Sequence, residues 1–374
     1  MTHSSGSVRL AAVGDIMMAR DVGRHYHTTP ADFAMPDVTA ILKSADVVCA
    51  NLENPVAIGG RPDPVQDPHV TFRAMPQTLD VLKALNVEVV SLGNNHMLDY
   101  GEAALIETLE RLDGAGIKRV GAGRNYQEAN EPVILKRNGR RLAFLSHAFI
   151  YSANSRMATA RQAGISDHRA SRIVPQVREL SRAGLDVVVM IHWGFEYRFF
   201  PIPYQMRQAR RMIDEGACII LGHGPHYPQG IERHRDRDIV YSLGNFIFDE
   251  PHKFANRSFI YSTEIVDGTT RSRGIVPVHL RHHVPHIVHG RERERLEGLL
   301  KTLSIRYAKT EQSYWKSLNT AYLTDICGRT IRGRSLKYLR VPPMSFYRDV
   351  GPAAILRKLK PTTLFSATRW VRAR

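Results

Sequence analysis

Cysteine is scarce in this sequence, which contains only Cys49, Cys218 and Cys327. The three residues lie far apart and form no CxxC pair, so the sequence encodes neither a disulfide framework nor a cysteine zinc site. Cys49 and Cys218 fall within apolar runs, and we expect both in the core rather than as reactive thiols.

Long apolar runs are also missing. No stretch reaches the roughly 18 apolar residues that a membrane-spanning helix needs. The opening residues, MTHSSGS, lack the charged and apolar regions of a signal peptide. We therefore expect a cytoplasmic protein, with peripheral contact at a membrane as the alternative.

Acidic residues are too few to balance the basic ones: 36 stand against 52, and the formal net charge is +16. Residues 290–374 hold 19 lysines and arginines against 6 acidic residues, a net charge of +13. We predict a main domain over residues 1–289 and a basic, mainly helical extension over residues 290–374. The extension presents either a solvated basic face or a contact surface for an anionic membrane. Nucleic acid is not expected as a partner, because no nucleic-acid motif is present.

From Val8 to about Phe248, short β-branched apolar runs alternate with helical patterns. This alternation predicts an α/β or α+β sandwich in which helices cover the sheets. The expected strands are residues 8–14, 45–51, 87–93, 141–147, 185–193, 217–223 and 238–248. The expected helices are residues 75–85, 101–116, 171–184 and 204–216. Residues 57–76 and 151–169 interrupt the rhythm and read as long polar loops, a type that often carries binding residues.

Polar side chains follow the apolar strands at the points where these end. They are Asp15, Asn51, Glu53, Asn94, Asn95, His96, His192, His223, His226 and Asn245. In a layered α/β fold such positions meet at one rim of the sheets, where binding sites lie. Each cluster alone has a simpler interpretation, a Gly-Asn turn or a buried histidine. Six clusters together favour a site.

The residue types at these positions indicate the chemistry of the site. Carboxylate, amide and imidazole ligands without cysteine suit Mn²⁺, Fe, Zn²⁺ or Mg²⁺. The number of candidate ligands favours a centre of two divalent metal ions over a single tetrahedral zinc.

The motifs VGDIMMAR, NLENPV, FRAMP, SLGNNHMLDYG, IHWGFEY, GHGPHYPQG and YSLGNFIF resemble, in the same order, those of the CapA family. That family is named for bacterial poly-γ-glutamate capsule synthesis and is related to the calcineurin-like metallophosphoesterases. The resemblance covers about residues 8–265. It implies a four-layer sandwich of two mixed sheets flanked by helices, with a dinuclear metal site.

The metal ligands that the resemblance implies are Asp15, Glu53, Asn95, His192, His223 and His226. Three positions depart from the superfamily pattern. Met17 stands where the superfamily usually has a histidine, and Glu53 replaces an aspartate by a side chain one methylene longer. The histidines of GHGPH are spaced by three residues instead of two.

Other residues receive roles in catalysis or substrate binding. His96 is the expected general acid. Asp99 either orients His96 or caps the helix that follows. Glu196 is a base, a partner of a ligand or a solvent-facing charge. Arg73 either binds an anionic substrate group or is an ordinary surface arginine. The remaining candidate substrate-binding residues are Asn51, Asn94 and Asn245.

Two functions of different class fit these features. The first is a metal-dependent hydrolase that cleaves a phosphoester, or a γ-glutamyl or related amide, in capsule, cell-surface polymer or secondary-metabolite biosynthesis. The second is a non-catalytic assembly subunit of a polymer-synthesis complex, which binds an anionic polymer such as poly-γ-glutamate. In both cases the ligand is an anionic small molecule or polymer.

Overall fold

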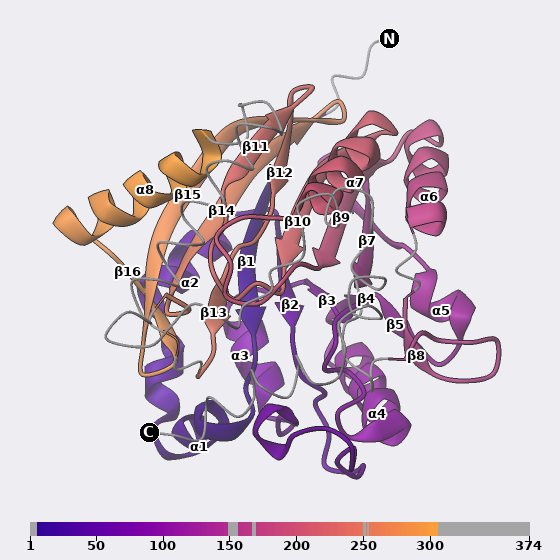
Figure 1. Ribbon diagram of the computed structural model, residues 1–374, viewed down its shortest axis with the longest axis vertical. Helices are drawn as coiled ribbons and strands as arrows, with labels where there is room; N and C mark the ends of the chain where they lie inside the picture. Colours follow the sequence, from indigo (N-terminus) through magenta and orange to yellow (C-terminus); the bar gives the residue numbers. More distant parts are fainter. Residues whose placement is uncertain (1–5, 149–155, 167–169, 250–251, 253, 306–374) are drawn as a thin grey trace, which may run out of the picture.

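A computed structural model describes residues 6–148, 156–166, 170–249, 252 and 254–305. Two mixed β-sheets pack face to face, and helices cover their outer faces (Figure 1). This arrangement confirms the predicted sandwich of two mixed sheets flanked by helices.

The larger sheet has the strand order β16-β15-β14-β1-β2-β3-β4, and β13 pairs with β1 beside this path. Its strands are β1 (Val8–Ile16), β2 (Val47–Leu52), β3 (Val89–Ser91), β4 (Lys118–Val120), β13 (Asn245–Ile247), β14 (Arg257–Val266), β15 (Thr269–Arg281) and β16 (Val284–Ile287). Strands β1 to β4 and β13 are parallel, whereas β14, β15 and β16 are antiparallel additions.

The smaller sheet has the order β11-β12-β10-β9-β7-β6. Its strands are β6 (Val133–Arg137), β7 (Arg140–Ala148), β9 (Asp186–His192), β10 (Ala217–His223), β11 (Ile231–His234) and β12 (Arg237–Val240). The four central strands are parallel, and antiparallel β6 and β11 form its edges. A separate pair joins β5 (Ala122–Gly123) to β8 (Gly164–Ile165).

The helices of the described residues connect and cover these strands. They are α1 (Arg20–Thr28), α2 (Pro36–Lys43), α3 (Thr78–Ala84), α4 (Gly101–Gly114), α5 (Tyr126–Asn130), α6 (Ala170–Arg182), α7 (Pro203–Asp214) and α8 (Gly290–Ile305), with short 3₁₀ turns at Pro30–Ala34 and Pro68–Val70. Helices α1 to α4 pack on the larger sheet, and α6 and α7 pack on the smaller one.

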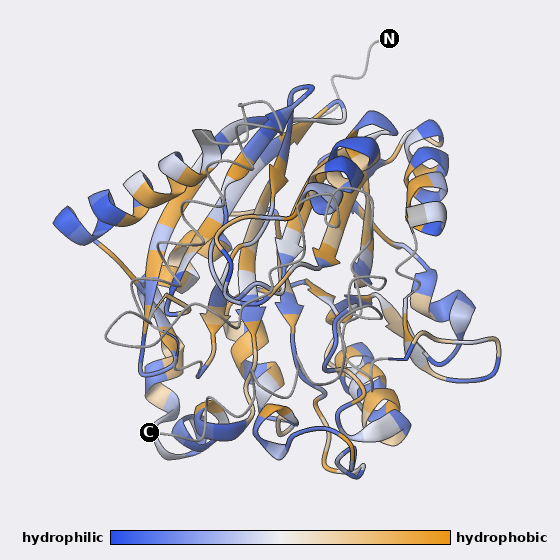
Figure 2. Cartoon of the chain, viewed as in Figure 1, coloured by the Kyte–Doolittle hydropathy of each residue, from blue (hydrophilic) through white to orange (hydrophobic). Residues whose placement is uncertain are grey.

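Alternate residues of each strand enter different layers of the core, as the two-residue period of a strand requires. Leu10 of β1 and Phe144 of β7 lie between the two sheets. Val13 of β1 faces the helices of its own sheet, and Leu145 of β7 faces α6 and α7. Figure 2 shows hydrophobic residues concentrated on the strands, with hydrophilic ones along the outer turns of α6, α7 and α8. Because the central strands are buried on both faces, their sequences read as continuous apolar runs.

One strand prediction is wrong. Residues 238–248 form two strands in different sheets: β12 ends at Val240 in the smaller sheet, and β13 begins at Asn245 in the larger one. The crossing brings Gly244 against Gly14, where a Cβ on Gly14 would lie 1.8 Å from the Gly244 carbonyl oxygen. Strands also continue beyond Phe248: β14, β15 and β16 follow one another to Ile287 without a helix between them.

The predicted helix after residue 290 is present as α8, which lies beside β15 in Figure 1. Its Leu296, Leu300 and Leu303 are buried, and the Ser304 hydroxyl accepts a hydrogen bond of 2.9 Å from the Ile231 amide. The predicted helix at residues 350–360 lies outside the described residues. No helix in the described part of the chain has the length and apolarity to cross a membrane.

Candidate metal centre

The carboxyl ends of β1, β2, β3, β9 and β10 supply the polar side chains predicted from the sequence, except Asn245, which is the first residue of β13 instead of following a strand. Asp15 lies near the end of β1, and Glu53 follows β2. His192 and His223 are the last residues of β9 and β10, and they are register neighbours. The two sheets are stacked with these ends at the same rim, so residues far apart in the sequence meet there. We call Asp15, Glu53, His192, His223 and His226 the central cluster.

Glu53 lies at the middle of this cluster, with its carboxylate fully buried. Its Oε1 atom faces three imidazole Nε2 atoms, at 3.7 Å from His226, 3.8 Å from His96 and 3.9 Å from His192. These separations exceed hydrogen-bond length, and Oε1 accepts no hydrogen bond from the described residues. A buried carboxyl oxygen in this state is compensated either by a bound cation or by protonation of the group.

Asp15 is also fully buried and joins the two sheets. Its Oδ1 atom lies 3.1 Å from Nδ1 of His223 and accepts a bond of 2.9 Å from the Asn51 amide. Its Oδ2 atom accepts a bond of 3.4 Å from the Gly224 N–H and lies 3.6 Å from Nδ1 of His226. The opposite nitrogen of His223, Nε2, is buried without a hydrogen-bond partner among the described residues.

Two asparagines beneath the cluster connect its members. The amide of Asn51 donates to Glu53 Oε2 at 3.2 Å as well as to Asp15. The amide of Asn94 donates to the side chain of Asn51 and to the Leu52 carbonyl, and its oxygen accepts from the His96 N–H at 3.0 Å. Both asparagines are fully buried. These bonds join the side chains of the cluster to one another, and the predicted role of the two asparagines in substrate binding stays a prediction.

His96 is held in a fixed orientation beside the cluster. Its Nδ1 atom lies 2.8 Å from Asp99 Oδ2, which also accepts a bond of 2.7 Å from the Phe72 N–H. The Phe72 ring stacks on the imidazole, with ring centroids 4.2 Å apart. Asp99 therefore pairs with His96; the cap of α4 is Tyr100, which makes no side-chain capping bond.

The unusual GHGPH spacing is accommodated by the backbone. Gly224 has φ +104° and His226 has φ +59°, both in the left-handed region. This path turns the His226 imidazole back toward the cluster, where its Nδ1 lies 2.8 Å from Asn245 Oδ1 and its Nε2 faces Glu53. A left-handed histidine costs conformational energy, which is typical of residues held at functional sites.

The electrostatics of the cluster reflect this burial. Burial would raise the pKa of Asp15, but contacts with His223 and His226 hold that pKa below its ordinary value. Burial, together with the charge of Asp15, raises the pKa of Glu53. Burial lowers the pKa of His226, but the charges of Glu53 and Asp15 outweigh it and raise that pKa. Burial lowers the pKa of His192 to about 3, which keeps its imidazole neutral and able to bind a metal.

These residues fit divalent metal ions. Ligand atoms of Asp15, Glu53 and His192 all lie within 4.8 Å of one another. Two nitrogen or oxygen ligands at about 2.0–2.2 Å from a shared ion are at most about 4.4 Å apart, so small shifts of these side chains would let them share one ion. The two orphaned atoms, Glu53 Oε1 and His223 Nε2, are of the kinds that such an ion takes.

Met17 supplies no ligand. It is fully buried in the core on the helix side of the larger sheet, and its sulfur accepts a bond of 3.1 Å from the Ala19 N–H. Met17 is therefore not a candidate ligand, in agreement with its departure from the superfamily pattern.

Three further predicted residues are Asn95, Glu196 and Arg73. Asn95 is half-buried in the turn after β3, and its metal role stays a prediction. Glu196 is exposed, yet its charge contributes to the raised pKa of Glu53. Arg73 donates from Nη1 to the carbonyls of Ile58 and Gly59 and lies 4.3 Å above the Tyr100 ring.

The aromatic surroundings of the site were not predicted from the sequence. Besides Phe72, the ring of Phe248 lies 5.0 Å from the His226 ring, and the ring of Tyr197 lies 5.8 Å from it. Arg20 extends this wall, with its Cζ 4.6 Å above the Phe72 ring and its guanidinium paired with Asp249. The signal that could have found these residues is their place in the motifs that carry the family resemblance: Arg20 ends VGDIMMAR, Phe72 begins FRAMP, and Tyr197 and Phe248 end IHWGFEY and YSLGNFIF.

The chain resembles known proteins in its sequence. Residues 9–250 match the bacterial capsule synthesis protein family PGA_cap. The chain belongs to this family. It is 31% identical over 281 residues to the capsule biosynthesis protein CapA of Bacillus anthracis, covering 74% of this chain and 68% of that protein. It is 30% identical over 234 residues to a "Probable polyglutamine synthesis accessory protein" of Mycobacterium tuberculosis, covering 59% of this chain and 61% of that one.

Among solved structures, the PGA_cap chain is similar to the NAD nucleotidase of Haemophilus influenzae. The TM-score is 0.45 at 12% identity, over 79% of this chain and 63% of that one. The likeness is weak, and membership of the family rests on sequence.

Proposed function

We propose that this protein is a metal-dependent hydrolase in the biosynthesis of a poly-γ-glutamate capsule, a related cell-surface polymer or a secondary metabolite. Its substrate is a phosphoester, or a γ-glutamyl or related amide. The observation that carries the proposal is Glu53 Oε1, buried among three imidazole Nε2 atoms at 3.7–3.9 Å. Its relatives' names, which refer to capsule biosynthesis and polyglutamine synthesis, support the biological setting.

Two divalent ions, of Mn, Fe, Zn or Mg, would be held by Asp15, Glu53, His192, His223 and His226, with Asn95 as the further predicted ligand. When bound, such ions supply Lewis-acid polarisation of the scissile bond and a more acidic water molecule. The protein's contribution is to exclude bulk water from these ligands and to fix their directions through Asn51, Asn94 and Asn245.

His96 is the proton donor in this proposal. With Nδ1 directed at Asp99, its Nε2 faces the cluster, and an Nε2–H of the imidazolium can pass its proton to a leaving group. Asp99 and the stacked Phe72 keep the ring in this orientation. Glu196 is exposed, and its charge is close enough to help raise the pKa of Glu53. It is the candidate base.

A second function has specific support. Met17, at the position of a superfamily histidine, is turned into the core. A centre with one ligand fewer suits a non-catalytic assembly subunit that retains the rim for binding an anionic polymer. The name of the M. tuberculosis relative, an accessory protein, agrees with such a role.

Elemental mass spectrometry of the purified protein separates the two functions. We expect close to two divalent ions per chain in the wild type, and their loss in Asp15→Asn and His223→Ala. The matched control is His234→Ala, because His234 pairs with Asp214 on the surface of β11. His96→Ala is expected to keep its metal and lose turnover of phosphoester and γ-glutamyl amide substrates. A wild-type protein that stays metal-free after loading with Mn²⁺ or Zn²⁺ would favour the assembly subunit over the hydrolase.

A further inference from the structure

Arg20 connects parts of the chain that lie far apart in the sequence. It begins α1, and its backbone is left-handed, with φ +50°. Its Nε donates a bond of 3.2 Å to Asp249 Oδ2, and its Nη2 pairs with Asp249 Oδ1. Its Nη1 donates to the carbonyl oxygen of His69. These contacts, which include a bidentate pair with one carboxylate, fix the plane of the guanidinium group.

Asp249 holds the side chain of Arg20 and the first turn of α1 together. Its side chain is 4% exposed, against 27% for that of Arg20. Its Oδ2 atom also accepts a bond of 3.1 Å from the Asp21 N–H. A left-handed arginine costs conformational energy and persists where its surroundings fix it, often at functional sites. The guanidinium group therefore has a defined place in the fold, unlike that of a surface arginine.

The fixed guanidinium group lies on the ring that stacks on His96. The Cζ atom of Arg20 is 4.6 Å from the centroid of the Phe72 ring, which is 4.2 Å from the centroid of the His96 ring. The Phe72 N–H donates to Asp99, but this bond does not fix the rotation of the side chain. Contacts of the ring itself do so, and they include Arg20 and an edge-to-face contact with Phe248 at 6.2 Å. A displaced guanidinium group would let the phenyl ring turn away from the imidazole.

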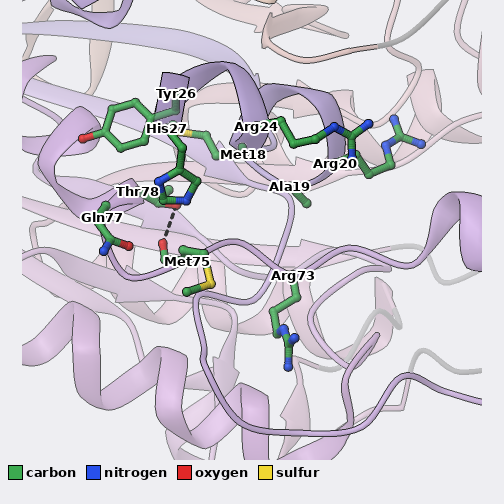
Figure 3. A pocket seen from close by; sticks show the side chains of 11 residues that line it. Met18, Ala19, Arg20, Arg24, Tyr26, His27, Arg73, Met75, Gln77 and Thr78 are labelled. Atoms are coloured by element: carbon green, nitrogen blue, oxygen red, sulfur yellow. Dashed lines mark hydrogen bonds between the residues drawn. The ribbon is translucent and has the colours of Figure 1, made fainter. Parts of the chain in front are cut away.

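Arg24 provides a comparison on the same helix. Figure 3 shows Arg20 and Arg24 projecting from α1 toward the same side, as side chains four residues apart do. Both border a pocket of about 200 Å³ between α1 and residues 73–78. Arg24 pairs with Asp21, and the two side chains are 75% and 56% exposed. Within the described part of the chain, the Arg24 guanidinium lies over no aromatic ring. The two arginines thus share charge, helix and pocket, and differ in the contact with Phe72.

We infer that Arg20 is a positioning residue for His96 and acts through Phe72. Held by Asp249 and the His69 carbonyl, its guanidinium group keeps the phenyl ring against the imidazole, whose Nε2 then stays directed at the central cluster. The inference rests on the proposed function, in which His96 is the proton donor. The stack itself can be measured without turnover.

NMR of the histidine rings tests the stack on the full chain, labelled with ¹³C in its histidines and incubated with Zn²⁺, which is diamagnetic. The His96 signal is identified by its absence in His96→Gln. A stacked phenyl ring shifts imidazole protons upfield, and the difference between wild type and Phe72→Leu measures this ring-current shift. We expect Arg20→Gln and Asp249→Asn to lose most of it and Arg24→Gln to keep it. The variants are compared at a pH where the ¹³C shifts show one protonation state of the ring.

Loss of the ring-current shift in Arg20→Gln supports the inference, provided that the signal of His234 on β11 is unchanged and so reports a folded chain. An unchanged His96 signal in Arg20→Gln overturns it. An equal loss in Arg24→Gln also overturns it, because the effect would then come from charge or from the pocket. So does a His96 signal that is the same in wild type and Phe72→Leu. If Arg20→Gln does not fold, Arg20→Lys takes its place with the same expectation, because lysine keeps the charge but lacks the planar fork.

Steady-state kinetics separate this role from the proposed function. With a substrate that the wild type hydrolyses, Arg20→Gln should lower kcat about tenfold and leave KM within about twofold, because proton donation is impaired and binding is not. Arg24→Gln should leave both constants unchanged. A stack that is lost without a fall in kcat would overturn the positioning role. No turnover by the wild type would refute the hydrolase, and the NMR result would still decide whether Arg20 holds His96 in place.

Discussion

The ring of Phe72 stacks on the imidazole of His96, with centroids 4.2 Å apart and an angle of 28° between the planes. Phe72 is 3% exposed and also lies beneath Arg20. We expect Phe72→Ala to lower the free energy of unfolding by about 3 kcal/mol, as large-to-small core substitutions do. Phe72→Leu should lose about half as much and still impair turnover, since only an aromatic ring stacks on His96. Urea denaturation measures the first effect and steady-state kinetics the second. Full turnover in Phe72→Leu would show that the stack has no role in orienting His96.

Asp99 provides a second test of how His96 is oriented. In Asp99→Asn, one amide replaces the acceptor of both the His96 Nδ1–H and the Phe72 N–H, so the ring loses its charged partner. We expect turnover to fall by about 10²-fold or more, with the metal content unchanged. Kinetics and elemental analysis of the same preparation check this. Loss of metal together with activity would instead indicate that the variant disturbs the central cluster.

Gly224 is predicted to be indispensable for the arrangement of the cluster. A Cβ at this position would lie 2.9 Å from His192 Nε2 and 3.0 Å from the Trp193 carbonyl oxygen, and φ is +104°. Gly224→Ala should therefore displace His192 and lower metal content. Gly116→Ala is the control for conformational strain alone, because φ is +75° there and no atom lies within 4 Å of the added Cβ. Both variants should lose about 1–2 kcal/mol of stability for the left-handed backbone, and metal retention in Gly224→Ala would contradict the steric argument.

Asp238 is expected to make folding sensitive to acid. This buried residue of β12 accepts bonds from Tyr261 of β14 and pairs with Arg273 of β15 and Arg233 of β11, and so links the two sheets. Burial raises the pKa of Asp238, but Arg273, Tyr261 and Arg233 outweigh it and lower that pKa. The resulting stability is fully present above the pKa of an unfolded aspartate, about 3.9, and is lost as the pH falls through the lower folded pKa.

Asp238→Asn tests this linkage. We expect a loss of roughly 2 kcal/mol near neutral pH. This is less than a fully buried pair loses, because the side chains of Arg273 and Arg233 are 33% and 41% exposed. The difference from wild type, measured by urea denaturation at several pH values, should shrink below about pH 4. Asp46→Asn, which breaks a surface pair with Arg9, is the control and should show a small difference throughout. A constant difference for Asp238→Asn would refute the assignment.

Sequence reasoning located the central cluster because parallel strands have their carboxyl ends at one rim. Asp15, His192 and His223 each end an apolar run, and that local pattern is enough to place them. Their joining across two sheets follows from the layered fold.

What the sequence did not predict depends on contacts between distant segments. Residues 238–248 read as one strand, because no residue pattern marks the place near Gly244 where the chain passes from one sheet to the other. That passage depends on the close approach of Gly244 to Gly14. Arg20 is 229 residues from its partner Asp249. The reversal of His226 results from its left-handed backbone, which a histidine does not signal.

The division of the candidate ligands between two sheets has a consequence for the whole chain. Asp15 and Glu53 belong to the larger sheet, whereas His192 and His223 belong to the smaller one. An ion bound by all four side chains would join the two sheets, and its binding free energy would add to the free energy of unfolding. Without the ion, the packing of the two sheets would be less stable, and the chain would be more open to proteolysis. The concentration of available metal would then help to set the amount of folded protein.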